Sequence, residues 1–426
     1  MTTPSTHGYI SKPDGDEIVS RAAENARLEE IDDAIYDRVL EIEARGQGTF
    51  IVAAANSLRG EGADFVCDGT DDDVQINEAI DALSAGGKIV LLDGTFRLGA
   101  PIVMAPTVHL KGQGSSSWIM LEDAHDADIS LIEAHADPAA NWMARISDLS
   151  IHGNKSEQSS GTITAVSIVE ASHVMVDHCN IMYCDNGVVL DLSGFCKVRD
   201  CYFYDVMANV IAIQNGGDCH QILDNIINRG SAAPLTPPEN IGVLITAVST
   251  DAACQGVIVR GNHIFNLRYG VKILDASQSD PYVRQATVEG NHLMFCTDTG
   301  IFVSGERGII KANHVLCAHT YGIRVTPGYD NIIAENMIEG AGMAPYADSC
   351  GISVQAMNTN VQGNVIRRKR VGEGDNNPTQ TKTGLYVTAG ATDNWVHGND
   401  LRDSGYTANY DDDGTGTLQS ENLGIT

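Results

Sequence analysis

Val-Arg-Gly-Asn (259–262), Val-Glu-Gly-Asn (288–291) and Ile-Lys-Ala-Asn (310–313) are copies of one short phrase, and this phrase decides the fold. It returns at intervals of about 22 residues, which lengthen only where loops are inserted. The other copies are Ile-His-Gly-Asn (151–154), Val-Asp-His-Cys (176–179), Val-Arg-Asp-Cys (198–201), Ile-Leu-Asp-Asn (222–225), Ile-Ala-Glu-Asn (333–336), Val-Gln-Gly-Asn (361–364) and Val-His-Gly-Asn (396–399). A β-rich phrase at a fixed spacing predicts a solenoid, in which each coil stacks on the next.

A second strand follows the phrase in most coils. It reads Gly-[Val/Ile/Leu]-x-[Val/Ile], and the alternation of a strand places the branched residues inside and the intervening residue outside. These strands are predicted at 187–190, 242–245, 270–273, 300–303, 322–325, 351–354 and 384–387. The inside of the solenoid is therefore apolar, whereas its outside is free to vary.

The Asn that ends the phrase forms a column from Asn225 to Asn399. Asn tolerates a left-handed bend, and its amide can bond to the coils on either side, so we expect a structural role. His263, His292 and His314 follow this Asn in three coils. A metal ladder is one interpretation. Stacked outward turn residues fit better, because coils stand about 4.8 Å apart and zinc lies about 2.1 Å from its ligands. We expect neither a metal site nor a cofactor.

The charge and cysteine content exclude several classes of protein. A formal charge of −29 argues against nucleic acid as a partner, since phosphate binding needs a basic surface. No apolar stretch of the sequence approaches about 18 residues, the length that a membrane-spanning helix needs, and there is no obvious signal peptide. We therefore expect no membrane insertion. The ten cysteines include no Cys-x-x-Cys pair, which favours buried free thiols. Such an acidic chain is typical of a virion protein, a secreted protein or a protein of high-salt environments.

Residues 16–45 have a helical pattern with one apolar stripe that includes Ile18, Leu28 and Ile35. The stripe needs a partner. It packs either on the end of the solenoid or against copies of itself in a short coiled coil, and we favour self-association.

The solenoid opens with ADFVCDGTDDDVQINEAIDALSAGGKIVLLDGTFRLGAPIVMAPTVHLKGQG (63–114). This stretch closely resembles the opening of pectate-lyase-like right-handed parallel β-helix proteins. In that family, an Asp-Gly-x-x-Asp-Asp segment starts a helix that caps the β-helix, and Gly-Gly-x-[Ile/Val] begins the first coil. The version found in phage and viral tailspikes often stands behind a helical neck. The resemblance covers about residues 50–400 and implies the fold but no single activity, because lyases, hydrolases, epimerases and binding proteins share it.

We therefore predict an all-β, right-handed, single-stranded parallel β-helix with an N-terminal α-helical neck. The expected parts are an extended arm and neck (1–48) for attachment and oligomerisation, the β-helix (49–402) with a capping helix (72–83), and an irregular capping tail (403–426). Asp68 and Asp71–Asp73 are expected to cap the helix start, with a metal site as the alternative. The tail covers the last coil, because an open end exposes unpaired strand edges.

Loop lengths indicate a binding surface. Three tight coils (262–270, 291–300 and 313–322) lie between coils with long loops at the same corner (229–240, then 340–350 and 370–383). Loops on both sides of three flush coils predict a trough. Aromatic rings stack on sugars and Arg binds carboxylates, so we expect an acidic glycan there, although an ordinary solvated face is the alternative. The candidate glycan-binding residues are Arg268, Tyr269, Lys272, Phe302, His319, Tyr321, Arg324 and Tyr386.

Asp200, Asp224 and Asp298 are candidate catalytic carboxylates. Glycoside hydrolysis needs two carboxyl groups about 5–5.5 Å or 6.5–9.5 Å apart. Asp200 and Asp224 occupy one column of adjacent coils and meet the first distance. Bonding of each Asp to local backbone at the turn is the competing interpretation.

A lyase or epimerase would need a base beside a uronate and a cation on its carboxylate. Lys272 or Arg324 could supply the cation, and Tyr269, Tyr321 or His319 the base. The sequence lacks the Arg-x-Pro-x-x-Arg segment of pectate lyases and the Asn-Thr-Asp, Gly-His-Gly and Arg-Ile-Lys segments of polygalacturonases. Whether the chain is an enzyme therefore stays open.

The hypothesis that these observations favour is a viral tail spike or fibre protein, of a phage or archaeal virus, that attaches to a host surface polysaccharide and could also degrade it. By resemblance to tailspikes we expect a homotrimer on the virion, joined to tail or capsid proteins through residues 1–48. The alternatives are a free-standing polysaccharide lyase, hydrolase or epimerase, secreted or on a cell surface, and a structural virion spike without catalysis.

Overall fold

The computed structural model describes residues 10–11, 18–19, 48–83, 85–135, 143–230, 239–247, 253–275, 283–342, 349–368, 382–405 and 407–425. The chain divides into two compact units, Met1–Thr49 and Phe50–Thr426. In the first unit, β1 (Ile10–Ser11) and β2 (Ile18–Val19) pair antiparallel. The prediction of helix at Ile18 and Val19 is wrong, since these β-branched residues form a strand. The rest of the predicted neck lies outside the described residues.

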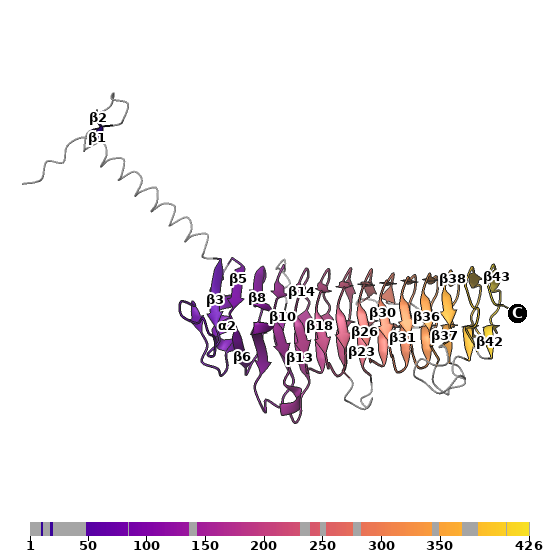
Figure 1. Cartoon of the computed structure of the whole chain (residues 1–426), viewed down its shortest axis with the longest axis horizontal. Coiled ribbons are helices and arrows are strands. Elements are labelled where there is room, and N and C mark those ends of the chain that lie inside the picture. Colours follow the sequence, from indigo (N-terminus) through magenta and orange to yellow (C-terminus); the bar gives the residue numbers. More distant parts are fainter. Residues whose placement is uncertain are drawn as a thin grey trace, which may run out of the picture. The chain divides into compact units, whose positions relative to one another are not determined.

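The second unit is a parallel β-helix in which each regular coil places one strand in each of three long sheets (Figure 1). Within the described residues, sheet 1 has 12 strands, sheet 2 has 15 and sheet 3 has 11. In one coil the chain passes from β25 in sheet 2 to β26 in sheet 3 and then to β27 in sheet 1. The pairings within these sheets are parallel, which confirms the predicted parallel β architecture.

The strands of the β-helix are short, and each belongs to one of the three long sheets or to a small one. Sheet 1 contains β7 (Ile102–Val103), β10 (Ile129–His135), β13 (Ile163–Val169), β16 (Asn186–Asp191), β19 (Asn209–Gln214), β23 (Ile241–Ala247), β27 (Tyr269–Asp275), β31 (Thr299–Val303), β34 (Tyr321–Val325), β37 (Cys350–Val354), β40 (Thr383–Val387) and β42 (Ala408–Asp412). Sheet 2 contains β4 (Phe65–Val66), β3 (Thr49–Ala53), β5 (Gly87–Leu91), β8 (Val108–Lys111), β11 (Arg145–Ser147), β14 (Met175–Asp177), β17 (Lys197–Arg199), β21 (Gln221–Leu223), β25 (Ile258–Arg260), β29 (Thr287–Glu289), β32 (Ile309–Lys311), β35 (Ile332–Ala334), β38 (Asn360–Gln362), β41 (Trp395–His397) and β43 (Leu418–Ser420). Sheet 3 contains β6 (Gly94–Leu98), β9 (Ser117–Leu121), β12 (Ser150–His152), β15 (Asn180–Met182), β18 (Tyr202–Tyr204), β22 (Ile226–Asn228), β26 (His263–Phe265), β30 (His292–Met294), β33 (His314–Leu316), β36 (Met337–Glu339) and β39 (Val365–Arg367). A small sheet contains β20 (Gly217–Asp218), β24 (Cys254–Gln255) and β28 (Val283–Arg284).

Branched aliphatic side chains stack inside the coils. Val271, Ile301 and Ile323 occupy one register line of sheet 1, and each is fully buried. Burying such a side chain contributes about 1.5–3 kcal/mol, and the contribution repeats in every coil. The core is therefore a continuous apolar column along the axis, as the alternation predicts.

The Asn column is a hydrogen-bonded ladder on the inside of the turn between sheets 2 and 3. In Asn313, Nδ2 donates to Val288 O at 2.9 Å and to Asn336 Oδ1 at 3.0 Å. Its Oδ1 accepts from the backbone N and the Nδ2 of Asn291, at 3.0 and 2.9 Å. The same bonds recur in the column Asn225, Asn262, Asn291, Asn313, Asn336, Asn364 and Asn399. The predicted structural role of these residues is confirmed.

The left-handed residue of this turn is not the Asn. It is the residue before it, with φ of 54° at Asp224, 71° at Gly261 and 57° at Glu335. The prediction that Asn takes the bend was wrong, because the Asn side chain must point inward to reach both neighbouring coils. Gly, Asp and Glu precede it, and Gly meets this backbone at the least steric cost.

Glycine is the second residue of most sheet 1 strands between β16 and β40, because sheets 1 and 3 approach closely there. A Cβ on Gly322 would lie 2.5 Å from Ile338 Cγ2 and 2.6 Å from Gly351 O. Gly300 and Gly351 show the same closeness to the next coil. These glycines therefore mark contact between sheets rather than a turn.

The helix α2 (Asp73–Asp81) follows β3 and β4 and lies inside the predicted range 72–83. Asp72 and Asp73 are buried, but Asp72 makes no side-chain capping bond to the helix. Instead Asp72 accepts hydrogen bonds from Gly69 N at 2.8 Å and Arg97 N at 2.7 Å, and Asp73 accepts from Gly99 N at 2.9 Å. The capping interpretation was wrong for these two, since their carboxylates tie the helix to β6.

The predicted irregular tail adds another coil instead. β42 pairs parallel with β40, and β43 pairs parallel with β41. Asn422 extends the Asn ladder by accepting a hydrogen bond from Asn399 Nδ2 at 2.9 Å. The prediction of irregular structure failed because polar residues replace the aliphatic pattern while the ladder residue persists.

A second buried polar column lies at the turn that enters sheet 2. His220 Nδ1 accepts from Cys196 N at 3.2 Å, and its Nε2 lies 3.0 Å from Ser193 O. Asn331 and Asn394 make the matching pair of bonds in later coils. His220 therefore makes the same pair of hydrogen bonds as an Asn side chain. These bonds require a neutral imidazole with its proton on Nε2. Burial lowers the pKa of His220 to about 4.

The ten cysteines are free thiols, and Cys219 alone among them is exposed. Burial raises the pKa of the Cys184 and Cys296 thiols to about 12, so these remain protonated and unreactive at neutral pH. The prediction of buried free thiols is confirmed for all but Cys219.

Candidate functional site

Several predicted glycan-binding residues form one contiguous group on the outer face of sheet 1. We call it the Lys272 cluster, and it consists of Arg268, Tyr269, Lys272, Asp298, Phe302, Tyr321 and Arg324. Lys272, Phe302 and Arg324 occupy one register line of three successive strands, β27, β31 and β34. The regular stacking of coils therefore brings together side chains that are 30 and 22 positions apart in the sequence.

Lys272 is the centre of the cluster. Its Nζ lies 4.6 Å from the Tyr269 ring centroid and 6.0 Å from that of Phe302, within the range of cation–π attraction. The amine also donates to Glu239 at 2.9 and 2.7 Å. These contacts leave the Lys272 side chain 8% exposed, against 45% for Glu239.

The carboxylate of Asp298 contacts two side chains of the cluster. The Tyr269 hydroxyl donates to Asp298 Oδ2 at 3.0 Å, and Arg268 Nε lies 3.4 Å from the same oxygen. Burial, with the Asp298 charge, raises the pKa of Tyr269 to about 12. Tyr269 is therefore a proton donor at neutral pH and not a base.

Arg324 stands between two rings. Its guanidinium carbon lies 4.8 Å from the Tyr321 centroid and 5.9 Å from the Phe302 centroid. Tyr321 is almost fully buried, whereas Phe302 and Arg324 are half-buried. Among the described residues, no carboxylate forms an ion pair with Arg324.

The remaining predicted glycan-binding residues lie outside the cluster. His319 is exposed on the turn before β34. Tyr386 continues the register line of Lys272 two coils beyond Arg324, where its hydroxyl donates to Asp413 at 2.9 Å. Most of the three long loops expected to form the trough lies outside the described residues.

The three candidate catalytic aspartates do not share one face. Asp200 and Asp224 are the left-handed residues of the turn between sheets 2 and 3, with φ of 54° each. Asp298 lies on the turn between sheets 3 and 1. Asp298 thus belongs to the Lys272 cluster, whereas Asp200 and Asp224 do not. A second carboxylate at the cluster, Glu239, bonds to Lys272 and was missed by sequence reasoning. The sequence feature that could have indicated Glu239 is its position at the end of the long loop, one residue before the buried Asn240.

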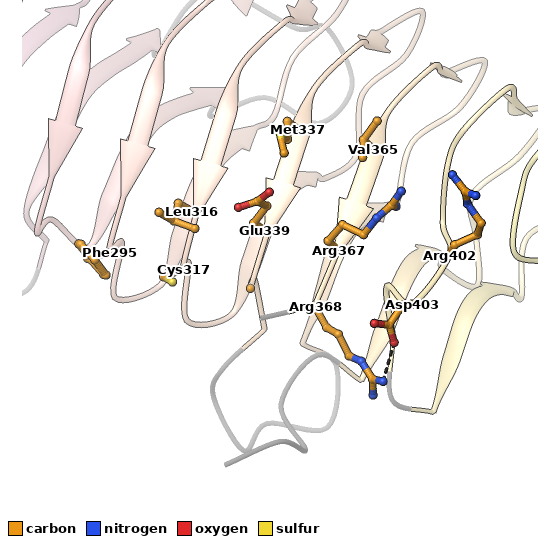
Figure 2. A pocket seen from close by; sticks show the side chains of 11 residues that line it. Phe295, Leu316, Cys317, Met337, Glu339, Val365, Arg367, Arg368, Arg402 and Asp403 are labelled. Carbon is orange, nitrogen blue, oxygen red and sulfur yellow. Dashed lines mark ion pairs between the residues drawn. The ribbon is translucent and has the colours of Figure 1, made fainter. Parts of the chain in front are cut away.

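A second candidate site was also missed. We call it the arginine pocket, a cavity of about 730 Å³ on the outer face of sheet 3 (Figure 2). The loops expected at 340–350 and 370–383 leave directly after β36 and β39, so the disturbed spacing does indicate this region. From the loop pattern, the binding surface was predicted on sheet 1, whose strands follow the loops in the chain. The cavity lies instead on sheet 3, whose strands precede the loops. Its lining residues are Phe295, Leu316, Cys317, Met337, Glu339, Gly340, Val365, Arg367, Arg368, Arg402 and Asp403.

The His column of sheet 3 is in register, but His263, His292 and His314 begin strands and do not lie on the turn as predicted. The rings of His292 and His314 stack 4.9 Å apart with 5° between their planes, whereas those of His263 and His292 meet edge to face at 5.6 Å and 75°. Nitrogen lone pairs lie in the ring plane, so parallel stacked rings do not converge on one ion. In the described part of the chain, no group of three His, Cys, Asp or Glu side chains is placed to hold a metal.

Two family profiles match the sequence. The family described as "Right handed beta helix region" matches residues 164–307, and the family described as "Periplasmic copper-binding protein (NosD)" matches residues 240–422. The stacked histidines of this chain do not fit a copper ligand set. No curated protein sequence matches. Among the described helices, none is both long and apolar enough to cross a membrane.

Solved structures with the same fold include proteins of different kinds. The Dettilon tailspike protein (gp208) is 17% identical, with a TM-score of 0.63 over 84% of this chain and 68% of its own. The DFA-IIIase of Arthrobacter chlorophenolicus A6 is 14% identical, with a TM-score of 0.63 over 81% and 93%. The A-module of the Azotobacter vinelandii mannuronan C-5 epimerase AlgE4 is 16% identical, with a TM-score of 0.51 over 84% and 96%. With the coil architecture, the two profiles and these matches confirm the right-handed parallel β-helix fold and the resemblance to pectate-lyase-like proteins.

Proposed function

We propose that this protein is a viral attachment protein, of a phage or archaeal virus, that binds a host surface polysaccharide through the Lys272 cluster. The observation that carries the proposal is the contiguous packing of Arg268, Lys272 and Arg324 with three aromatic rings on one outer face. Aromatic rings stack on sugar faces, and cations bind the carboxylates of acidic sugars. Asp298 and Glu239 form ion pairs with Arg268 and Lys272, so the cluster keeps the positive charge of Arg324, which is suited to a negatively charged glycan in a chain of net charge −29.

The similarity of fold to a tailspike supports the viral part of the proposal, and the similarity to two enzymes whose names refer to saccharides supports a carbohydrate ligand. The proposed assembly is a homotrimer on the virion, attached through residues 1–48 to tail or capsid proteins. Light scattering on the full chain should give a mass about three times 45.4 kDa. A monomeric mass would contradict the trimer and leave the ligand proposal intact.

A second candidate function is polysaccharide cleavage or epimerisation. It is favoured by two carboxylates, Glu239 and Asp298, which bond to different members of the same cluster. Tyr269, protonated and bonded to Asp298, would donate a proton to a leaving oxygen. A structural spike without catalysis is the third candidate, and the same experiment separates all three.

The test uses the full chain with the purified surface polysaccharide of the host. Binding is measured by surface plasmon resonance, and cleavage by new reducing ends and by the ultraviolet absorbance of unsaturated uronates. The variants are Lys272→Met, Phe302→Ala and Arg324→Gln. Lys197→Met, on the outer face of sheet 2, removes one lysine from another face as the matched control.

We expect each cluster variant to weaken binding by about tenfold, which corresponds to about 1.4 kcal/mol, and the control to bind as the parent does. Binding without new ends identifies an attachment protein, and new ends identify an enzyme. If the triple variant binds as tightly as the parent, the Lys272 cluster is not the glycan site. If the parent itself does not bind, the structural spike is the remaining interpretation.

A further inference from the structure

The arginine pocket is a binding site separate from the Lys272 cluster. Its floor is the outer face of sheet 3, formed by β33, β36 and β39, whereas the Lys272 cluster lies on sheet 1. A cavity of about 730 Å³ is within the usual range for small-ligand sites. It therefore has room for one or a few sugar rings.

Two guanidinium groups of the pocket share one carboxylate. Arg402 donates to Asp400 Oδ1 and Oδ2 at 2.9 and 2.7 Å, and Arg367 Nη2 donates to the same Oδ2. Figure 2 shows the tips of Arg367 and Arg402 at one end of the pocket, while Arg368 extends toward Asp403 at the other end. Because one carboxylate neutralises only one guanidinium, the group of Arg367, Arg402 and Asp400 keeps one positive charge.

This charge is held in place. The hydrogen bonds from Arg402 and Arg367 keep the pKa of Asp400 well below its usual range, so the carboxylate remains ionised. Arg367 Nη1 is also fixed by the carbonyl oxygens of Ile366 and Asp400, at 2.8 and 2.9 Å. An arginine that is already ordered loses less entropy when a ligand binds. The N–H groups of Arg367 and Arg402 that do not bond to Asp400 or to backbone carbonyls can donate to a second carboxylate.

The rest of the lining indicates a sugar rather than a simple anion. Met337, 41% exposed, and Leu316 offer an apolar floor on neighbouring strands, against which a ring can pack. Glu339 lies on the same face, one coil before Arg367 in register. Its carboxylate can accept hydrogen bonds from the hydroxyl groups of a sugar ring.

We propose that the arginine pocket binds an acidic saccharide, with the sugar carboxylate on Arg367 and Arg402, the ring over Met337 and Leu316, and a hydroxyl on Glu339. The site goes beyond the proposed attachment through the Lys272 cluster and does not depend on it. It gives the rod a second sugar-binding face on sheet 3.

The experiment is calorimetric titration of the full chain with trigalacturonic acid and with its fully methyl-esterified form, which has the same rings without the charges. Arg402→Gln removes one guanidinium that is 64% exposed, so it disturbs the fold little. Met337→Glu places a negative charge, of the same sign as the sugar carboxylate, on the apolar surface of the pocket. It tests the site without substituting an arginine. Arg260→Gln, at an exposed arginine of sheet 2, is the matched control.

We expect saturable binding of the acid, at least about tenfold weaker binding of the ester, and a loss of about tenfold in both Arg402→Gln and Met337→Glu. Arg260→Gln should bind the acid as the parent does. Equal binding of acid and ester, or unchanged binding in both pocket variants, would overturn the proposal. If Lys272→Met alone loses the acid, the Lys272 cluster is the sugar site and the pocket is not.

Discussion

Two turns of the same coil differ in how they are built. The Asn turn joins sheets 2 and 3 by two residues, such as Asp224 and Asn225 or Ala312 and Asn313, and repeats its hydrogen bonds from coil to coil. The loop turn joins sheets 3 and 1, and it ranges from the short 266–268 to the long 229–240 and 340–349. Both candidate sites lie beside the loop turn.

The difference shows what each turn contributes. At the Asn turn the side chain is buried between coils, so any change leaves partners unsatisfied in two neighbours. At the loop turn the strands on both sides are already fixed by their sheets, and the number of connecting residues differs from coil to coil. We therefore expect stability to depend mainly on the Asn turn, and the two proposed binding sites lie beside the loop turn. Substitutions and insertions at the two turns can test this division.

The largest effect is expected from Asn313→Leu. The substitution removes four hydrogen bonds of the ladder, two donated to Val288 and Asn336 and two accepted from Asn291. Leaving buried donors and acceptors without partners should lower the free energy of unfolding by about 4 kcal/mol. Chemical denaturation followed by circular dichroism measures this loss. Gln362→Leu, a partly exposed amide on the outside of sheet 2, is the control and should change little.

Gly322→Ala should cost about 2 kcal/mol, because the new methyl group would overlap Ile338 and the carbonyl of Gly351. Gly290→Ala is the comparison within the Asn turn. A Cβ at Gly290 would have no heavy atom within 4 Å, and only its φ of 63° opposes a side chain, so about 1 kcal/mol is expected. Equal losses in the two variants would contradict the close approach of sheets 1 and 3 as the reason for the glycine column.

Much of this architecture could be predicted from the sequence, because a solenoid repeats its constraints. The phrase around Asn262 and the strand at 270–273 each recur often enough to reveal the inside and the outside. The register follows from repetition too, which is why Lys272, Phe302 and Arg324 could be placed together. Features that occur once were harder. Glu239 and the pair Arg402–Asp400 have no repeat to mark them.

The errors have the same origin. The polar tail at 403–426 lacks the aliphatic signal that sequence reasoning relied on, yet its Asn422 still continues the ladder. Asp200 and Asp224 looked like a carboxylate pair because they share a column. The structure places them at left-handed turn positions, where an Asp is favoured for backbone reasons.

A smaller effect should appear on acidification through His220. Its folded pKa is lowered to about 4, below the usual 6.5, so the neutral ring favours the folded state. This stability is fully present above pH 6.5 and is lost as the pH falls toward 4, because the unfolded chain then binds the proton more readily. The loss should be on the order of 1 kcal/mol at pH 5.5. His220→Asn copies the bonds of Asn331 without a titrating group, and it should lose less stability than the parent between pH 7 and 5.5. An unchanged slope would mean that other groups cause the acid sensitivity.

The smallest effect is expected from lengthening a loop turn. A Gly-Ser insertion between His319 and Thr320 leaves the strands β33 and β34 in place and enters where neighbouring coils already carry longer connections. Extending a surface loop costs little, so the free energy of unfolding should fall by less than about 1 kcal/mol. The same insertion between Ala312 and Asn313 would move the amide out of the ladder and should cost as much as Asn313→Leu. Chemical denaturation of the two insertions therefore compares the turns directly. Similar losses in both would show that the loop turn is as constrained as the Asn turn, and the division between stability and binding would not hold.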